Sequence, residues 1–185
     1  SALDASIVFS FGKSGYRRHS QHFDASDLEV DLSALTFVVT GANSGIGYQT
    51  ALGLAHLGAR IIMVCRNQDR GEMAKARIID ESGNGRVTLE LADLSDHDAV
   101  RRLASNLPDV IHGLVHNAGN MVHEPIASPQ GVELITALHL TGPYLLTRLM
   151  IPALEAGAQS GRSRVVFVSS GGMYGAKLEP AELNQ

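Results

Sequence analysis

The stretch Thr-Gly-Ala-Asn-Ser-Gly-Ile-Gly at residues 40–47 decides the fold of this chain. It separates an apolar run at residues 37–39 from an amphipathic stretch at residues 46–57. Gly41 permits a tight turn, Gly45 lets backbone N–H groups approach a pyrophosphate, and Gly47 lets the helix pack close to the strand. Phosphates are favoured at the N-terminus of this helix, because its N–H groups are unpaired and its dipole is positive. The stretch therefore predicts a strand–turn–helix unit that binds a dinucleotide.

Short apolar runs alternate with amphipathic stretches along the rest of the chain. The predicted strands are residues 37–39, 61–65, 87–91, 113–115 and 165–168, and the predicted helices are residues 46–57, 69–81, 96–105 and 129–156. Strands separated by helices of this length indicate βαβ crossovers and a parallel sheet. Because the strands are nearly continuous apolar runs, helices should cover both faces of the sheet. The predicted fold class is α/β, a Rossmann-like doubly wound parallel sheet with helices on both faces and the C-terminal part of the fold missing.

The length and composition of the chain exclude several classes of function. The chain has 185 residues, 44% hydrophobic and 18% charged, which is typical of one globular domain. Its net charge of −4 argues against a nucleic-acid partner. The single cysteine, Cys65, excludes an internal disulfide, and the scattered histidines show no convincing ligand pair, so we predict no metal site. These features favour a cytoplasmic protein or one of an organelle interior, not a secreted one.

The N-terminal residues differ in composition from the rest of the chain. We predict an extension over residues 1–34 and an incomplete dinucleotide-binding domain over residues 35–185. The extension is rich in aromatic side chains, which either pack back onto the domain or form a docking arm for a membrane surface or a partner. Basic residues such as Arg17 and Arg18 leave a mitochondrial presequence open, although Asp4 argues against one. No apolar run approaches the ~20 residues of a membrane helix, so no transmembrane segment is predicted.

The glycine spacing resembles the Thr-Gly-x-x-x-Gly-x-Gly signature of the short-chain dehydrogenase/reductase family. Further matches occur in the order of the family's motifs. Asp93-Leu94 ends the third predicted strand, and residues 116–119 (His-Asn-Ala-Gly) resemble the family's Asn-Asn-Ala-Gly. Residues 140–148 resemble the middle of its long fifth helix, and residues 168–170 resemble the strand end that carries its catalytic serine. The resemblance covers about residues 35 to 178. The opening Lys13-Ser14-Gly15-Tyr16 and the run Ser170-Gly171-Gly172-Met173 resemble most the retinol-dehydrogenase-like branch of the family.

The resemblance implies a nicotinamide dinucleotide as the cofactor. The residues that would bind it are Gly41, Asn43, Ser44, Gly45, Ile46, Gly47, Arg66, Asp93, Leu94, Asn117, Ala118 and Gly119. In NAD-preferring sites, an acidic residue at the end of the second strand binds the ribose 2′-hydroxyl. This chain has Arg66 there, which could pair with a 2′-phosphate. We therefore predict NADP(H) over NAD(H), against the alternative that Arg66 is an ordinary exposed residue.

The resemblance also implies hydride transfer between the nicotinamide and an alcohol or carbonyl carbon. By position, Ser170 is the family's catalytic serine, and His139 stands in the place of its asparagine. A histidine can also pass protons near neutral pH, but a packing or surface role for His139 fits equally well. The family's Tyr-x-x-x-Lys pair is absent downstream of Ser170, and we interpret Tyr174 and Lys177 as loop residues.

These observations predict an NADP(H)-binding oxidoreductase of the short-chain type, represented by its N-terminal cofactor-binding part and acting on a small alcohol or carbonyl compound. The alternative is a non-catalytic accessory subunit of a larger assembly. The apolar strand at residues 165–168 has an interior pattern, although it is the last strand in this sequence. Either a continuation of the polypeptide or a partner protein is expected to cover it.

Overall fold

A computed structural model describes residues 12–122, 124–161 and 163–171. They form two compact units, one of residues 31–168 and one of residues 12–30 with residues 169–171. The larger unit contains a parallel five-stranded sheet with the order β3-β2-β1-β4-β5. Its strands are β1 (Thr36–Thr40), β2 (Arg60–Cys65), β3 (Val87–Leu91), β4 (Gly113–His116) and β5 (Arg164–Phe167). The predicted parallel sheet is confirmed.

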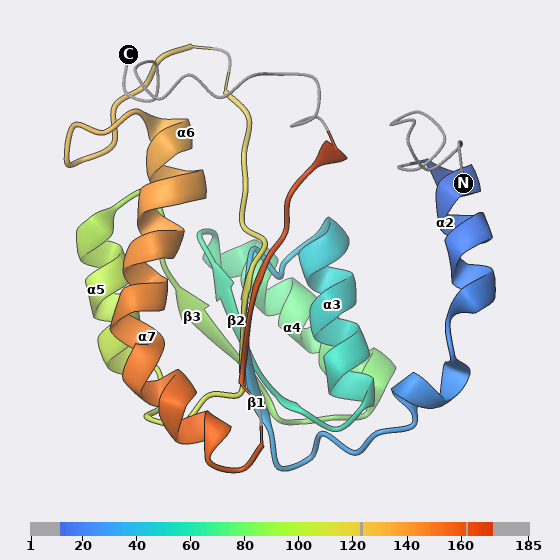
Figure 1. Cartoon of the computed structure of the whole chain (residues 1–185). Coiled ribbons are helices and arrows are strands. Elements are labelled where there is room, and N and C mark those ends of the chain that lie inside the picture. Colours follow the sequence, from blue (N-terminus) through green and yellow to red (C-terminus); the bar gives the residue numbers. More distant parts are fainter. Residues whose placement is uncertain (1–11, 123, 162, 172–185) are drawn as a thin grey trace. The chain divides into compact units, whose positions relative to one another are not determined.

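Helices cover both faces of this sheet (Figure 1). The helices α3 (Gly45–His56) and α4 (Gln68–Ser82) lie on one face, and α5 (His97–Asn106) and α7 (Gly142–Ala158) lie on the other. Adjacent residues of β1 point to opposite faces. Val38 therefore packs with the α5 and α7 cluster, whereas Val39 packs with the α3 and α4 cluster. The continuous apolar strands thus result from a sheet with two buried faces, as the Rossmann-like prediction requires.

Local signals set the limits of the helices after β2 and β3. The Asn67 side chain accepts a hydrogen bond from the Arg70 N–H and caps α4, and the Asp96 side chain caps α5 by accepting from the Asp98 N–H. At its other end α4 stops at Gly83, whose φ of 68° suits glycine. These caps place the start of both helices within a residue or two of the predicted positions.

The helix predicted over residues 129–156 is wrong at its beginning. Residues 127–133 instead form a turn closed by a bridge between Ala127 and Glu133, with Gly131 at a φ of 76°. The Glu133 carboxylate then caps α6 (Leu134–Thr136), and the chain continues through a π-helical turn, η3 (Ala137–Thr141), into α7. The left-handed glycine and the Glu133 cap explain why helix begins only at residue 134.

The stretch Leu134–Ala158 is long and apolar enough to cross a membrane by length and composition alone. In the structure, however, its apolar side chains Leu146, Met150 and Leu154 are buried in the cluster shared with α5 and the sheet. Burial in the core accounts for part of this apolar character, since 28% of the most apolar 18-residue window is buried.

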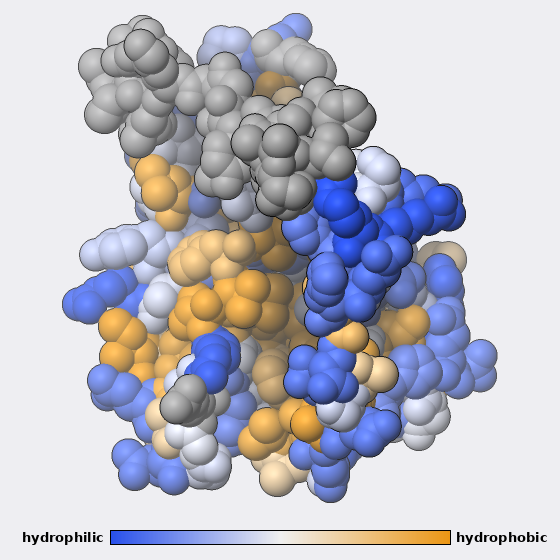
Figure 2. Space-filling model, turned by 45° about the vertical axis from the view of Figure 1, so that its right-hand side comes forward, coloured by the Kyte–Doolittle hydropathy of each residue, from blue (hydrophilic) through white to orange (hydrophobic). Residues whose placement is uncertain are grey.

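The strand β5 lies at one end of the sheet. Within the described residues it pairs only with β4, and its side chains are exposed, with Val166 at 46% and Phe167 at 58%. Figure 2 shows apolar surface gathered across the middle of the visible face, with hydrophilic side chains around it. An exposed apolar parallel strand leaves both predicted covers open, a continuation of the polypeptide and a partner protein.

The smaller unit contains α2 (Lys13–His19), η1 (Ser20–His22) and η2 (Ala25–Leu28). The rings of Tyr16 and Phe23 meet edge to face with centroids 6.2 Å apart, and both side chains are about two-thirds exposed. Both interpretations of the N-terminal extension stay predictions.

Candidate functional site

The buried Thr40 hydroxyl connects the glycine-rich turn to the loop after β4. Its Oγ1 donates to the Val115 carbonyl at 3.2 Å and accepts from the N–H groups of Asn117 and Ala118, each at 3.0 Å. The Asn117 side chain donates two hydrogen bonds from Nδ2, to the carbonyl oxygens of Thr40 and Gly41. Because β1 and β4 are adjacent and parallel, their carboxyl ends bring the two motifs together.

Close approach of backbones explains two of the glycines. A Cβ added at Gly41 would lie 2.8 Å from the Cα of Ala118. One added at Gly47 would overlap Asn117 Nδ2 and lie 2.5 Å from the Gly41 carbonyl oxygen. Gly47 therefore permits a close approach, but the neighbours that require it are the Asn117 amide and the turn itself, whereas the sequence predicted close packing against the strand.

The N-terminus of α3 suits an anion. Its N-cap residue, Ser44, makes no side-chain capping bond, whereas α4 and α5 both carry side-chain caps. Gly45, at a φ of 55°, has no atom within 4 Å of the position that a Cβ would occupy. The open turn at Gly45 provides space for a pyrophosphate, and the unpaired N–H groups of α3 provide a positive potential. The residues present therefore fit a dinucleotide.

A cleft of about 420 Å³ runs along the carboxyl ends of β1, β2, β3 and β4. Ten of the twelve predicted cofactor residues line it, namely Gly41, Asn43, Ser44, Ile46, Arg66, Asp93, Leu94, Asn117, Ala118 and Gly119. Gly45 and Gly47 do not line it, but they lie in the same turn and shape it from behind. Ligands of open α/β sheets bind at this edge, where the strand order reverses between β1 and β4.

Arg66 and Asp93 face each other across one end of this cleft. The Arg66 Nη1 lies 3.7 Å from Asp93 Oδ2, and the two side chains are 66% and 36% exposed. The other carboxylate oxygen of Asp93 accepts from both the N–H and the hydroxyl of Ser95. Asp93 is therefore fixed by the backbone after β3, whereas Arg66 stays exposed to an incoming ligand.

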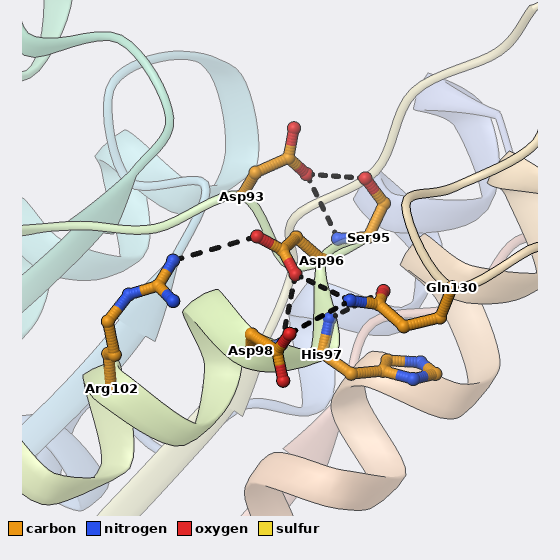
Figure 3. A network of polar contacts seen from close by, with 7 residues as sticks. All are labelled: Asp93, Ser95, Asp96, His97, Asp98, Arg102 and Gln130. Carbon is orange, nitrogen blue, oxygen red and sulfur yellow. Dashed lines mark hydrogen bonds and ion pairs between the residues drawn. The ribbon is translucent and has the colours of Figure 1, made fainter.

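Figure 3 shows the contacts between Asp93 and Ser95 and, next to them, a second group of polar contacts at the start of α5. Asp96 Oδ1 accepts from Gln130 Nε2 at 2.9 Å, and Asp96 Oδ2 lies 3.6 Å from Arg102. Hydrogen bonding from Gln130, supported by the Asp98 N–H, holds the pKa of Asp96 below its usual value. The side-chain amide oxygen of Gln130, Oε1, in turn accepts from the His97 backbone N–H. The network ties the turn at residues 127–133 to the start of α5.

Comparison with known proteins supports the resemblance seen in the sequence. A family model for short chain dehydrogenases matches residues 35–179. The chain belongs to this family. Relatives include dehydrogenase/reductase SDR family member 12 from Bos taurus, 41% identical over 170 residues, which cover 91% of this chain and 53% of the relative. Retinol dehydrogenase 11 from Mus musculus is 36% identical, covering 78% and 46%. These relatives agree with the predicted retinol-dehydrogenase-like branch.

Solved structures agree with the fold. A metagenomic short-chain oxidoreductase in complex with NADP has 30% identity and a TM-score of 0.64, covering 75% of this chain and 63% of its own. A protein from Mycobacterium paratuberculosis has 34% identity and a TM-score of 0.63, covering 71% and 46%. The chain spans about half the length of the curated relatives it matches.

His139, in the place of the family's asparagine, lies within the π-helical turn η3. Its Nε2 is 3.0 Å from the Asn120 carbonyl oxygen and 3.3 Å from the Asn120 nitrogen. A Cβ on Gly119 would lie 2.9 Å from the same ring. His139 thus holds the loop at residues 119–120 that lines the cleft, although its own side chain is not part of the lining.

Ser170 comes after β5 and is exposed, but it belongs to the smaller unit. Its role as the short-chain dehydrogenase serine therefore stays a prediction. Tyr174 and Lys177 lie outside the described residues.

Sequence reasoning missed several residues of the site. The cleft is also lined by Val64, Cys65, Asn67, Arg70, Ala92, Asn120 and Leu138. Arg70 carried a usable signal, because it lies four positions after Arg66 in the first turn of the next helix. Gln130 carried none, since its link to Asp96 depends on how the chain returns after β4.

The thiol of Cys65 should be unreactive in the folded protein. Cys65 is 2% exposed, and burial raises its pKa to about 11 although backbone N–H groups of Ala42 and Asn43 act in the opposite direction. Only the thiolate is nucleophilic, so alkylation by iodoacetamide near neutral pH should be roughly a hundredfold slower than in guanidinium chloride. Because the chain has one cysteine, mass spectrometry of the labelled protein reports this site alone. Rapid stoichiometric labelling of the folded protein would contradict the burial.

Proposed function

We propose that this chain forms the cofactor-binding part of an NADP(H)-dependent oxidoreductase that acts on an alcohol or carbonyl compound. The observation that carries the cofactor choice is the exposed Arg66 guanidinium at the end of β2, which lines the cleft where NAD-preferring sites have a carboxylate. A guanidinium forms charge-assisted, bidentate hydrogen bonds with phosphate. The metagenomic relative in complex with NADP agrees with this choice.

Different parts of the cleft would bind different parts of the cofactor. The uncapped N-terminus of α3 would bind the pyrophosphate, and Asp93 and Leu94 would lie beside the adenine. Asn117, Ala118 and Gly119 would form the wall toward the nicotinamide. When bound, the cofactor supplies or accepts the hydride.

The remaining catalytic residues stay proposals. Ser170 would orient the substrate oxygen, and His139 would support the loop at residues 119–120 beside the reacting end. Relatives named retinol dehydrogenases suggest hydrophobic alcohols and aldehydes as the first substrates to try.

The test is to measure dissociation constants of NADPH and NADH on the natural full-length polypeptide by nicotinamide fluorescence. We expect tighter NADPH binding, and we expect Arg66→Gln to weaken it about tenfold, since a hydrogen bond to a charged group contributes about 1.5–3 kcal/mol. Equal or tighter NADH binding would overturn the cofactor choice. Turnover of a retinoid and carbonyl panel with NADPH then tests the reaction. Binding without turnover would favour the alternative of an accessory subunit.

A further inference from the structure

We infer that Arg70 is a second specificity-determining residue, which binds the 2′-phosphate of NADP(H) together with Arg66. This role rests on the proposed function and falls to a residue that the sequence motifs do not include. Arg66, Asn67 and Arg70 line the same end of the cleft, beside Asp93. The lining at this end therefore holds two guanidinium groups and one carboxylate.

The single carboxylate is already engaged. Asp93 places one oxygen 3.7 Å from the Arg66 guanidinium and gives the other to Ser95. In contrast, the Arg70 guanidinium makes no ion pair or hydrogen bond with any residue of the described ranges 12–122, 124–161 and 163–171. A ligand phosphate would therefore meet a shared cation at Arg66 and an unshared one at Arg70.

Arg70 lines the cleft from the first turn of α4. The Asn67 side chain caps α4 by accepting from the Arg70 N–H at 2.9 Å, so the backbone of Arg70 is held in the first helical turn. The positive end of the α4 dipole adds to the same field. Asp69 also lies in this first turn and offsets part of the charge, but it does not line the cleft. The balance of charge in the lining favours a dianionic group over a hydroxyl.

The cleft would thus bind the groups shared by both cofactors and the 2′-phosphate of NADP(H) with different residues. Pyrophosphate and adenine are common to both cofactors and would be bound by the turn, α3 and Asp93. Only the 2′-phosphate distinguishes NADP(H), so removing Arg70 should change the preference and leave NADH binding unaltered. Arg70 is exposed, so this substitution should not disturb the core.

The experiment compares dissociation constants of NADPH and NADH for the natural full-length protein and for Arg70→Gln, Arg66→Gln and the double variant. Adenosine 2′,5′-bisphosphate and AMP, as nicotinamide-free probes, report the same end of the site alone. The matched control is Arg101→Gln on the exposed surface of α5, which does not line the cleft. Melting curves verify that each variant is folded.

We expect Arg70→Gln to weaken NADPH and the bisphosphate about tenfold, with NADH and AMP within about twofold of the unsubstituted protein. An unchanged NADPH-to-NADH ratio in Arg70→Gln, with a lost preference in Arg66→Gln, would overturn the role of Arg70 and leave the proposed function intact. Equal weakening of both cofactors would place Arg70 on a shared group and also overturn it. If the unsubstituted protein binds neither cofactor, the proposed function itself fails.

Discussion

Gly47→Ala should destabilise the larger unit by about 3 kcal/mol and abolish measurable cofactor binding. The new methyl group would overlap Asn117 Nδ2 and lie 2.5 Å from the carbonyl oxygen of Gly41, and the second of these is backbone that cannot rotate away. Overpacking of this kind costs about 1–3 kcal/mol and more where the backbone must move. Because Asn117 joins the turn to the loop after β4, its displacement would open the cleft as well.

The matched control lies in the same helix. Gly53 is exposed in α3 and has no atom within 4 Å of its Cβ position. Gly53→Ala should therefore stabilise the protein by about 0.5–1 kcal/mol through helix propensity alone. Urea unfolding and NADPH titration of both variants give the comparison. Equal stability of the two variants would contradict the close contact between α3 and the turn.

Stability should also fall by roughly 3 kcal/mol on acidification to about pH 4, because His116 is buried as a neutral ring. His116 is 5% exposed, and burial lowers its pKa from 6.5 to about 4. Since Thr147 Oγ1 donates to the Pro143 carbonyl, His116 Nε2 must be the donor in its 2.8 Å contact with that oxygen. Its Nδ1 has no hydrogen-bond partner within the described part of the chain.

The sign of this effect depends on which state takes up the proton first. Above pH 6.5 the ring is neutral in both states, so its full contribution is present. As pH falls from 6.5 toward 4, the His116 ring takes up a proton in the unfolded chain but stays neutral in the folded protein. The free energy of unfolding therefore falls through this pH range. Below about pH 4 both states are protonated and the loss levels off.

Urea unfolding at about pH 7.5 and about pH 4.5 measures this loss, and His116→Asn removes its source. The variant should lose less stability than the unsubstituted protein between these two values, whatever its stability at neutral pH. A loss of the same size in His116→Asn would show that other groups carry the acid sensitivity.

The sequence predicted best those features that depend on neighbours along the chain. The strand–turn–helix unit at residues 40–47 depends on glycines that lack side chains, so its motif could be read from the local sequence alone. The alternation of apolar strands and helices likewise predicted the parallel sheet, because an interior strand must bury both of its faces.

Features that depend on distant parts of the chain could not be predicted. The turn at residues 127–133 is set by Gly131 and the Glu133 cap, and its link to α5 through Gln130 spans 34 positions. The contact between the His139 ring and the Asn120 backbone requires the π-helical turn, which has no simple sequence signal. The position of Arg70 after Arg66 could be read from the sequence, but the ion pair that engages Arg66 and not Arg70 depends on Asp93, which follows a different strand.

The order of strands in the sheet also bears on how the protein is made. The central strand β1 pairs with β4 through residues such as Phe37 and Gly113, which are 76 positions apart. At roughly 5–20 residues per second, a ribosome needs about 4–15 seconds to synthesise that interval. During this delay one edge of β1 has no neighbour, and its apolar residues are open to wrong contacts. Nascent chains of this protein should therefore depend on chaperone protection until β4 has emerged.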